Sequence, residues 1–243
     1  MDTLNLIASM LVEQLQAGDA VGFTFFTGYM SMFAASVFFF LERTNVDGKW
    51  KTSLLVSGLI TMIAAVHYFY MRDYYLESGG GSPTEFRYID WTLTVPLMCV
   101  EFYLLLRPYG AKIMTMWLLI LASVEMLVTG YIGEAIDPGN TILWGVLSTV
   151  GYLYIVYEAT AGSIKKLADA SDNPNVGQAV RLLRNFVIVG WAIYPIGYMT
   201  MEGNLLAGMF DLDLIYNIGD AVNKIGFGLV VYSVAVKSTA QGV

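Results

Sequence analysis

Seven stretches of about 20 mainly apolar residues occupy almost the whole of this 243-residue chain. An α-helix of about 20 residues crosses the hydrocarbon core of a bilayer, so each stretch predicts one transmembrane helix. Charged residues make up 14% of the chain, against about 25% in soluble domains. The short connections leave no room for a soluble domain, so we predict a single all-α bundle of seven helices in a lipid bilayer. The predicted spans are 20–41, 53–72, 86–106, 113–133, 141–161, 182–201 and 212–236.

The basic residues between the spans predict how the bundle lies in the membrane. Cytoplasmic loops carry an excess of lysine and arginine. Basic residues follow spans one, three, five and seven, whereas the loops after spans four and six carry acids such as Asp137 and Asp211. We therefore expect an extracellular N-terminal segment (1–19), a transmembrane domain (20–237) and a cytoplasmic tail (238–243). The basic residues are Arg43, Lys49, Lys51, Arg107, Lys112, Lys165, Lys166, Arg181, Arg184 and Lys237.

Charge and cysteine content exclude several classes of partner and bond. The net charge of −7 comes largely from the outward face and predicts no nucleic-acid partner. Residues 1–18 include a short apolar stretch without the basic flank of a secretory signal, which favours a small surface helix or the remnant of a processed leader. The single Cys99 excludes an intramolecular disulfide.

Lys224 and Asp220 lie inside the last apolar span. A lone charge at the centre of a membrane helix costs at least about 2.5 to 3.5 kcal/mol, so such charges are paired or functional. The two residues are four apart and can reach each other on one helical face. A purely structural ion pair is the simpler alternative, but the apolar surroundings favour a functional lysine.

The third predicted span contains two acids, Asp90 and Glu101. Eleven steps of about 100° bring them back to nearly one face, roughly 16 Å apart along the helix axis. Thr94 lies one turn after Asp90 and can hydrogen-bond it, and Arg87 lies one turn before it toward the outside. Because this span runs inward, Asp90 falls in the outer half of the membrane and Glu101 in the inner half, as two stations on one route.

Several motifs resemble those of microbial (type 1) rhodopsins, in particular the proteorhodopsin and xanthorhodopsin group. They are RYIDW, the TVPL that follows it, the glutamate eleven residues after the aspartate, WAIYPIGY in span six and IYNIGDAVNK in span seven. The similarity extends over all seven spans. It implies that Lys224 carries all-trans retinal as a Schiff base, a covalent chemistry suited to a buried amine.

The resemblance also implies roles for the other charged residues. Asp90 corresponds to the primary counterion and proton acceptor, and Thr94 to its hydrogen-bonded neighbour. Asp220 is the second counterion, Arg87 balances the excess negative charge, and Glu101 is the cytoplasmic proton donor. This combination of Asp, Thr and Glu is typical of outward proton pumps, whereas sodium pumps carry Asn, Asp and Gln, and chloride pumps lose the aspartate.

Such a pump needs its two acids in opposite states at rest. Light moves the Lys224 proton to an ionised Asp90, which can discharge it only outward. A protonated Glu101 in the dry inner half then returns a proton from the cytoplasmic side. One cycle exports one proton.

His67, the only histidine of the chain, falls on the second span. Two interpretations are open: a core histidine satisfied by a backbone carbonyl, or, as the resemblance implies, a hydrogen-bond partner that tunes Asp90. In some relatives a tryptophan of span one approaches this histidine from another subunit. Phe26 stands there in this chain, which puts such a link in doubt.

The resemblance predicts the residues that surround retinal. Met98 stands where leucine or methionine accompanies green absorption and glutamine accompanies blue, so green absorption is expected. An aromatic stripe at helical spacing can also be plain core packing. The expected retinal-binding residues besides Lys224 are Trp91, Met98, Met126, Gly130, Trp191, Tyr194, Pro195, Tyr198 and Asn223.

Gly145 stands where many relatives carry a bulky aromatic residue beside the retinal ring. A glycine in a membrane helix is often a close-packing site. The alternative is a lateral opening in which a hydroxylated carotenoid antenna contacts the ring, as in xanthorhodopsin-like proteins.

Two rival functions use the same retinal site. A photosensor would signal to a membrane transducer and would not need a proton donor at Glu101, and a light-gated channel would need a continuous hydrated path. A seven-span receptor without retinal would leave Lys224 unexplained. We expect no metal site and no enzymatic turnover, and no role is assigned to Glu125. The resemblance implies a homo-oligomer, a pentamer or hexamer, in a prokaryotic cell membrane.

Overall fold

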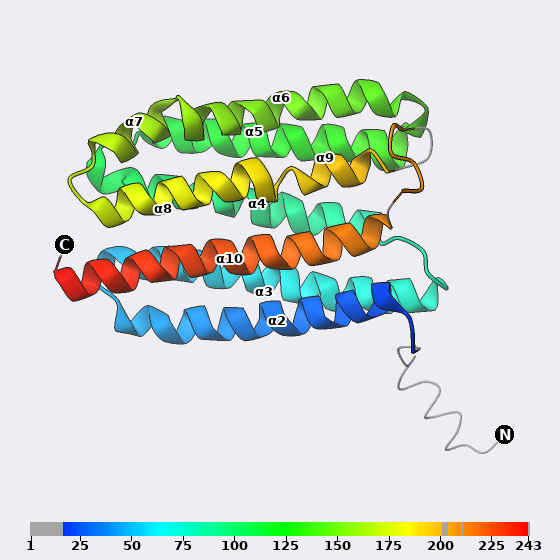
Figure 1. The fold of residues 1–243 in the computed structure, drawn as a ribbon, viewed down its shortest axis with the longest axis horizontal. Coiled ribbons are helices and arrows are strands. Elements are labelled where there is room, and N and C mark those ends of the chain that lie inside the picture. The colour runs from blue at the N-terminus through cyan, green and yellow to red at the C-terminus, as the bar shows by residue number, and fades with distance from the viewer. Residues whose placement is uncertain (1–16, 201–203, 210, 243) are drawn as a thin grey trace, which may run out of the picture.

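The computed structural model describes residues 17–200, 204–209 and 211–242. In this part of the chain, seven helical segments are long and apolar enough to cross a membrane, which confirms the predicted class. The helices run along one common direction, and the start of α2 and the end of α10 lie at opposite ends of the bundle (Figure 1). The spans are formed by α2 (Ala20–Glu42), α3 (Gly48–Glu77), α4 (Thr84–Leu106), α5 (Ile113–Tyr131), α6 (Thr141–Thr160), α8 (Pro174–Asn185) with α9 (Ile193–Tyr198), and α10 (Leu212–Gln241).

Short helical turns connect or extend these spans. The 3-10 turns are η1 (Arg43–Asn45), η2 (Arg107–Tyr109) and η4 (Pro138–Asn140). The π-helical turns are η3 (Ile132–Ile136) and η5 (Phe186–Gly190). Between α6 and α8 lies the short helix α7 (Ser163–Ala170).

Three spans are longer than predicted. α3 begins at Gly48 instead of residue 53, the sixth span begins at Pro174 instead of 182, and α10 continues to Gln241. The added residues are largely polar, so a search for apolar stretches stops before them. Residues 238–241 of the expected tail are therefore helical. Residues 1–16 lie outside the described part of the chain, and with them most of the predicted surface helix or leader remnant.

Side-chain caps mark the first residues of α8 and α10. Asn173 precedes α8, and its Oδ1 accepts a hydrogen bond from the Asn175 backbone N–H at 2.9 Å. Pro174 occupies the first helical position, where a missing N–H costs nothing. Asp211 caps α10 in the same way by accepting from the Leu214 backbone N–H at 3.0 Å. Local capping therefore places the start of α8 before the predicted apolar stretch, whereas α10 starts at residue 212 as predicted.

The sixth span is interrupted in its middle, between α8 and α9. A π-helical turn removes regular helical partners from nearby carbonyl groups, and side chains of neighbouring helices replace them. Tyr152 donates to the carbonyls of Val187 and Ile188 at 3.1 Å each, and Asn223 donates to the carbonyl of Gly190 at 2.9 Å. The interruption is thus held by α6 and α10.

Buried and exposed residues are arranged as expected for a membrane protein. Arg87, Asp90 and Glu101 are fully buried, whereas Ile142 and Val146 are exposed. Lipid contacts apolar side chains without cost, but charged side chains must face the interior of the bundle. The chain is a multi-pass membrane protein whose ionisable residues meet inside.

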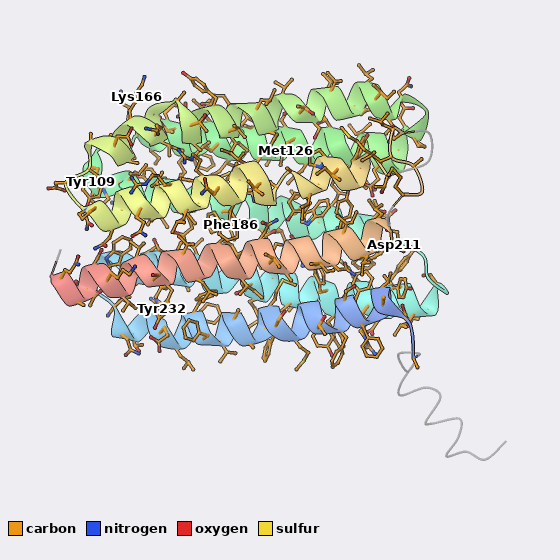
Figure 2. All side chains as sticks on the ribbon, in the orientation of Figure 1. Tyr109, Met126, Lys166, Phe186, Asp211 and Tyr232 are labelled. Atoms are coloured by element: carbon orange, nitrogen blue, oxygen red, sulfur yellow. The ribbon has the colours of Figure 1, made fainter. Side chains whose placement is uncertain are left out.

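Two labelled residues mark the ends of the bundle. Lys166 lies at the end where α10 finishes, and Asp211 lies at the other end (Figure 2). These ends are called the Lys166 end and the Asp211 end below. The basic connections after α2, α4 and α6 lie at the Lys166 end, and the acidic connections after α5 and α9 lie at the Asp211 end.

Candidate functional site: a buried lysine between two carboxylates

Lys224 lies in the middle of the bundle and is 2% exposed. Its Nζ donates to Oδ2 of Asp220 at 2.6 Å, one turn earlier in α10, and to Oδ2 of Asp90 in α4. Both carboxylates are fully buried. Removing one partner from such a group leaves an uncompensated buried charge, which typically costs about 3 to 5 kcal/mol. The three residues therefore depend on one another.

The two carboxylates differ in their remaining contacts. Oδ1 of Asp220 accepts a hydrogen bond from Tyr194 of α9 at 2.9 Å. Oδ1 of Asp90 has no hydrogen-bond partner among the described residues. A hydrogen bond to an ionised carboxylate stabilises the charged form. Of the two carboxylates, Asp90 is therefore the one with an oxygen that can accept a further proton.

His67 and Thr94 lie beside Asp90 but do not bond its carboxylate. His67 Nδ1 is 3.9 Å from Oδ1 of Asp90 and 2.8 Å from the Ile63 carbonyl oxygen, one turn earlier in α3. Thr94 donates to the backbone carbonyl of Asp90 at 2.8 Å. Of the two interpretations of His67, this geometry matches the histidine satisfied by a backbone carbonyl. Thr94 contacts Asp90 through its main chain.

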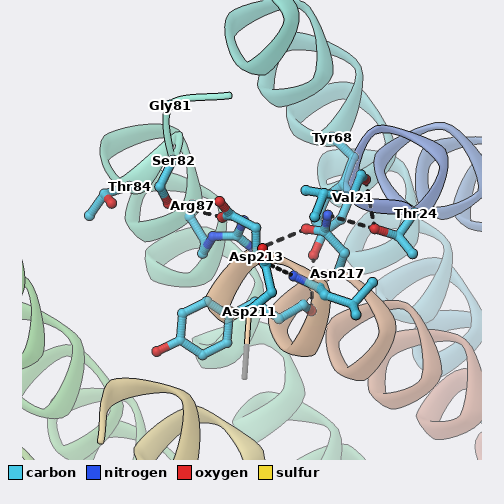
Figure 3. A network of polar contacts seen from close by, with 12 residues as sticks. Val21, Thr24, Tyr68, Gly81, Ser82, Thr84, Arg87, Asp211, Asp213 and Asn217 are labelled. Atoms are coloured by element: carbon cyan, nitrogen blue, oxygen red, sulfur yellow. Dashed lines mark hydrogen bonds and ion pairs between the residues drawn. The ribbon is translucent and has the colours of Figure 1, made fainter. Parts of the chain in front are cut away.

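Arg87 lies one turn before Asp90 in α4 but does not pair with the two carboxylates around Lys224. Its Nη2 donates to Oδ1 of Asp213 at 2.6 Å, and its Nη1 donates to Oδ1 of Asn217 at 3.2 Å (Figure 3). Asp213 is a site residue that the sequence analysis did not identify. The spacing of 213, 217, 220 and 224 along one helical face is the sequence signal that could have identified this second pair.

Glu101 lies further along α4, toward the Lys166 end, and is fully buried. Its Oε1 accepts a hydrogen bond from Ser57 of α3 at 3.4 Å, and its Oε2 has no partner in the described part of the chain. The rings of Phe102 and Phe227 pack 6.2 Å apart beside this region. Glu101 is thus in a dry environment, separate from the carboxylates around Lys224.

A mainly apolar cavity, part of which opens to the surface, reaches residues that contact the partners of Lys224. Trp91 adjoins Asp90 in sequence, and Tyr194 bonds Asp220; both line the cavity. The predicted retinal-binding residues that line it are Trp91, Met126, Gly130, Gly145, Trp191, Tyr194, Pro195 and Tyr198. Met98 and Asn223 are buried outside its lining. The lining residues that sequence reasoning missed are Tyr88, Val95, Leu127, Ser148, Thr149, Tyr152 and Tyr216.

The cavity fits an elongated apolar ligand such as retinal. Aromatic rings form its walls: the ring of Trp91 lies 4.9 Å from that of Tyr194 and 5.1 Å from that of Tyr216. A Cβ atom added to Gly130 would lie 3.2 Å from Oη of Tyr88, so glycine keeps this wall open. An apolar cleft with a few polar groups at one end is the usual form of a cofactor site, and a buried amine at that end suits an aldehyde.

Gly145 lies on the cavity wall where the cavity approaches the surface of the bundle. Thr149 and Pro195 also line the cavity and are themselves exposed. A Cβ atom added to Gly145 would lie 3.1 Å from Cε1 of Tyr198. Gly145 therefore packs closely against Tyr198 and lies beside exposed residues of the cavity wall.

The remaining acids of the spans have local partners. Glu134 accepts hydrogen bonds from Tyr88 at 2.9 Å and Thr84 at 3.3 Å, and Glu158 accepts from the hydroxyl of Ser163 at 2.7 Å. Glu125 faces Gly151 of α6. No group of three or more potential metal-binding side chains occurs in the described part of the chain.

Comparison with known proteins identifies the family. The model of the bacteriorhodopsin-like protein family matches residues 19–238. The chain is 44% identical over 233 residues to a green-light absorbing proteorhodopsin of Gamma-proteobacterium EBAC31A08, covering 93% of this chain and 91% of that protein. It is 45% identical over 232 residues to a blue-light absorbing proteorhodopsin of Gamma-proteobacterium Hot 75m4, covering 93% and 90%.

A solved structure agrees with these relatives. Xanthorhodopsin, described as a light-driven ion pump with dual chromophore, matches with a TM-score of 0.76 and 30% identity, covering 91% of this chain and 94% of that one. The predicted resemblance is therefore confirmed. This chain belongs to the bacteriorhodopsin-like protein family.

Proposed function

We propose that this protein is a light-driven outward proton pump that carries all-trans retinal as a Schiff base on Lys224. One observation carries the proposal: a buried lysine lies between two buried carboxylates, and a second, isolated acid lies further along the same helix as one of them. Relatives named as proteorhodopsins and as a light-driven ion pump support it. Bound retinal would supply the absorption of visible light and a light-driven change in the surroundings of Nζ.

The contacts of the two carboxylates support Asp90 as the proton acceptor. Lys224 Nζ holds a proton between Asp90 and Asp220. The hydroxyl of Tyr194 stabilises Asp220 in its ionised form, while Oδ1 of Asp90 has no partner in the described residues. The proton of Nζ therefore passes to Asp90, and Asp220 stays ionised as the second counterion.

The position of Glu101 supports its role as the proton donor. It lies between Asp90 and the basic Lys166 end, which we assign to the cytoplasm by the positive-inside rule. Its hydrogen-bond partner is the neutral hydroxyl of Ser57, and no ion pair to Glu101 occurs in the described residues, so we expect Glu101 to be protonated at rest. After Asp90 has taken the proton of Lys224, Glu101 returns one from the cytoplasmic side.

The layer between Lys224 and Glu101 supports a pump over a passive channel. Met98 of α4 and Phe227 of α10 are buried at this level. A channel would need polar or hydrated groups along the whole route, whereas apolar side chains interrupt it here. Proton transfer from Glu101 to Lys224 therefore requires a conformational change in this layer. Such a required step can make the transport unidirectional.

Light-dependent pH changes test the proposal. Cells that express the protein with added retinal are suspended without buffer and illuminated with green light, with and without a protonophore. We expect acidification that the protonophore abolishes, and no change with the Lys224→Ala variant. Alkalinisation that survives the protonophore would indicate another ion, and a coloured protein without any pH change would favour the photosensor.

We further propose that Gly145 admits a hydroxylated carotenoid that transfers excitation to retinal. Support comes from the exposed cavity wall around Gly145, Thr149 and Pro195 and from the dual chromophore named for xanthorhodopsin. Adding the carotenoid should give retinal-dependent energy transfer that Gly145→Phe removes. Energy transfer that persists in Gly145→Phe would contradict this route.

The setting of the pump is also part of the proposal. We place it in a prokaryotic cell membrane as a pentamer or hexamer, with the N-terminal segment outside. Relatives from gamma-proteobacteria support the prokaryotic membrane, whereas the oligomer rests on the family resemblance. Chemical cross-linking in native-like membranes measures the number of subunits.

A further inference from the structure

A second buried ion pair lies between Lys224 and the Asp211 end. Arg87 is fully buried, and Asp213 is 7% exposed. The guanidinium carries a permanent charge and directs two of its nitrogens to Asp213 and Asn217, both of α10. In the described structure no ion pair joins Arg87 to Asp90 or Asp220, although Asp90 is only one turn away in the same helix.

Several contacts hold this pair in place on the side away from Lys224. Ser82 donates to Oδ1 of Asp213 at 2.9 Å, the same oxygen that accepts from Arg87 (Figure 3). The side-chain nitrogen of Asn217 donates to Oγ1 of Thr24 at 3.0 Å, so its oxygen is turned toward Arg87. These bonds come from α2, α10 and the connection before α4, and they stabilise one position of the guanidinium.

The rest of the guanidinium lies between aromatic rings and makes no further hydrogen bond in the described structure. Its carbon lies 5.1 Å from the centre of the Tyr216 ring and 5.7 Å from that of Phe25. Its Nε has no hydrogen-bond partner in the described residues. The Arg87 side chain is long and has an unused donor. If Asp213 loses its charge, the guanidinium can move toward Asp90 and Asp220.

The neighbouring carboxylates would attract this cation. Asp90 and Asp220 share the single charge of Lys224, so their group has a net charge of −1 when both are ionised. A positive charge near an acid favours its ionised form. An unpaired Arg87 would therefore make Asp90 a weaker base, whereas an Arg87 neutralised by Asp213 leaves Asp90 able to accept a proton.

We propose that Asp213 is a positioning residue that keeps the Arg87 guanidinium paired away from Asp90 and Asp220, and so sets the pH at which Asp90 takes up a proton. This inference rests on the proposed retinal site, because it assigns Asp90 the role of acceptor. Asp213 acts through Arg87 and touches neither Lys224 nor its carboxylates in any recorded contact.

Other ionisable groups surround these residues, and their charges contribute to the same titration. Glu134 of η3 acts on both Arg87 and Asp213. Tyr75 of α3 is influenced by Asp19, Asp211 and Asp213. The groups that face Arg87 or Asp90 from the packed helices are Tyr68 and His67 of α3, Tyr194 of α9, and Tyr216, Asp220 and Lys224 of α10. A test must therefore separate the effect through Arg87 from a general loss of negative charge.

The test measures the pH midpoint of the visible colour change in the retinal-loaded protein. Asp213→Asn should lower this midpoint by about one pH unit, a tenfold lower proton affinity of Asp90. Asp213→Glu keeps the charge and should stay near the unchanged protein. Asp211→Asn is the matched control, since it removes the same charge two residues away while asparagine still caps α10. A midpoint that Asp213→Asn leaves unchanged or raises would overturn the proposal.

A double-mutant cycle with Arg87→Gln separates an effect transmitted through Arg87 from direct repulsion between Asp213 and Asp90. If Asp213 acts through Arg87, Asp213→Asn should shift the midpoint much less in the Arg87→Gln background. An equal shift in both backgrounds would mean direct repulsion between the acids and would overturn the positioning role. If Asp213→Asn gives no coloured protein, Asn217→Asp offers a second measurement. It adds a negative partner to Arg87 and should raise the midpoint; a lower one would contradict the proposal.

The outcomes distinguish this inference from the proposed function. An unchanged protein that shows no colour with retinal would contradict the Lys224 site itself. A coloured protein that does not pump would contradict the pump, while its colour titration would still report on Asp213. A midpoint shift confined to Asp213→Asn, in a protein that pumps, is the result expected from both.

Discussion

Nζ of Lys224 lies 2.6 Å from Oδ2 of Asp220 and also contacts Oδ2 of Asp90, so one cation is shared by carboxylates from two helices. α4 and α10 both start at the Asp211 end (Figure 1), which brings the corresponding levels of the two helices together. The shared cation stabilises both acids in a buried position that neither could occupy alone. Changes at any of the three residues should therefore affect the other two.

Lys224→Ala should remove all visible absorption, because it removes the buried amine that is proposed to bind retinal. The variant also leaves Asp90 and Asp220 without their cation, so we expect lower stability, by about 3 to 5 kcal/mol. Absorption spectra after addition of retinal measure the first effect, and thermal unfolding measures the second. Lys237→Ala, at an exposed position of α10, is the control and should keep its colour. A coloured Lys224→Ala protein would overturn the retinal assignment.

Asp90→Asn should shift the absorption to the red and stop proton transport. The amide removes the negative charge beside Nζ and cannot accept the proton, while Asp220 keeps its hydrogen bond from Tyr194. Spectra of the purified protein and light-dependent pH changes in cells measure the two effects. Asp172→Asn, an exposed acid before α8, serves as the control. Transport at an undiminished rate by Asp90→Asn would exclude Asp90 as the acceptor.

The charged residues of the site could be predicted from the sequence because they interrupt apolar stretches. Lys224, Asp220, Asp90 and Glu101 stand out against their neighbours, and the helical repeat gives their relative positions. All four are buried in the structure. The number of spans follows from the same contrast, since seven apolar windows correspond to seven helical segments.

Other features depend on contacts between helices and could not be predicted in this way. The interruption of the sixth span is held by Tyr152 and Asn223, which lie far from it in sequence. The hydrogen bond from Arg87 to Asp213 is such a contact. Asp213 was overlooked because a charge close to a predicted span end resembles a solvated loop residue. Asp213, in the first turn of α10, nevertheless pairs with Arg87 of α4.

Green absorption is the expected colour, because methionine occupies position 98. Met98 is buried close in sequence to Asp90 but does not line the cavity, so it would act on the chromophore at a distance or after rearrangement. Met98→Gln should shift the absorption maximum to shorter wavelengths. Met98→Leu is the matched apolar control and should stay green. A maximum in the blue for the unchanged protein would contradict this prediction.

Asp137, in the connection between α5 and α6, predicts how acid affects this end of the bundle. Hydrogen bonds from the Trp144 indole at 3.0 Å and from the Asn140 amide hold the pKa of Asp137 below its ordinary value. A lowered folded-state pKa contributes stability above the unfolded pKa of about 3.9, and this contribution is lost as pH falls through the lower folded value. Thermal unfolding at pH 6 and pH 3 should differ less in Trp144→Phe than in the unchanged protein. An equal difference would contradict this contribution.

Glu101→Gln should leave the colour unchanged and slow the recovery after a flash. Glu101 is separated from Lys224 by buried apolar side chains, so its charge state has little effect on absorption. General acids contribute about 10² to 10⁴ to the rate of a proton transfer, so we expect recovery at least about 100-fold slower at neutral pH.

The pH dependence of this recovery identifies the source of the proton. Without an internal donor, the proton must come from bulk water, so the recovery rate of Glu101→Gln should fall about tenfold for each unit of rising pH, as the proton concentration does. The unchanged protein should show a much weaker dependence, because Glu101 delivers its own proton first. Ser57→Ala is the control: it removes the hydroxyl that bonds Oε1 but keeps the carboxyl, so its recovery should keep the weak dependence. A weak dependence in Glu101→Gln would mean that another group donates the proton.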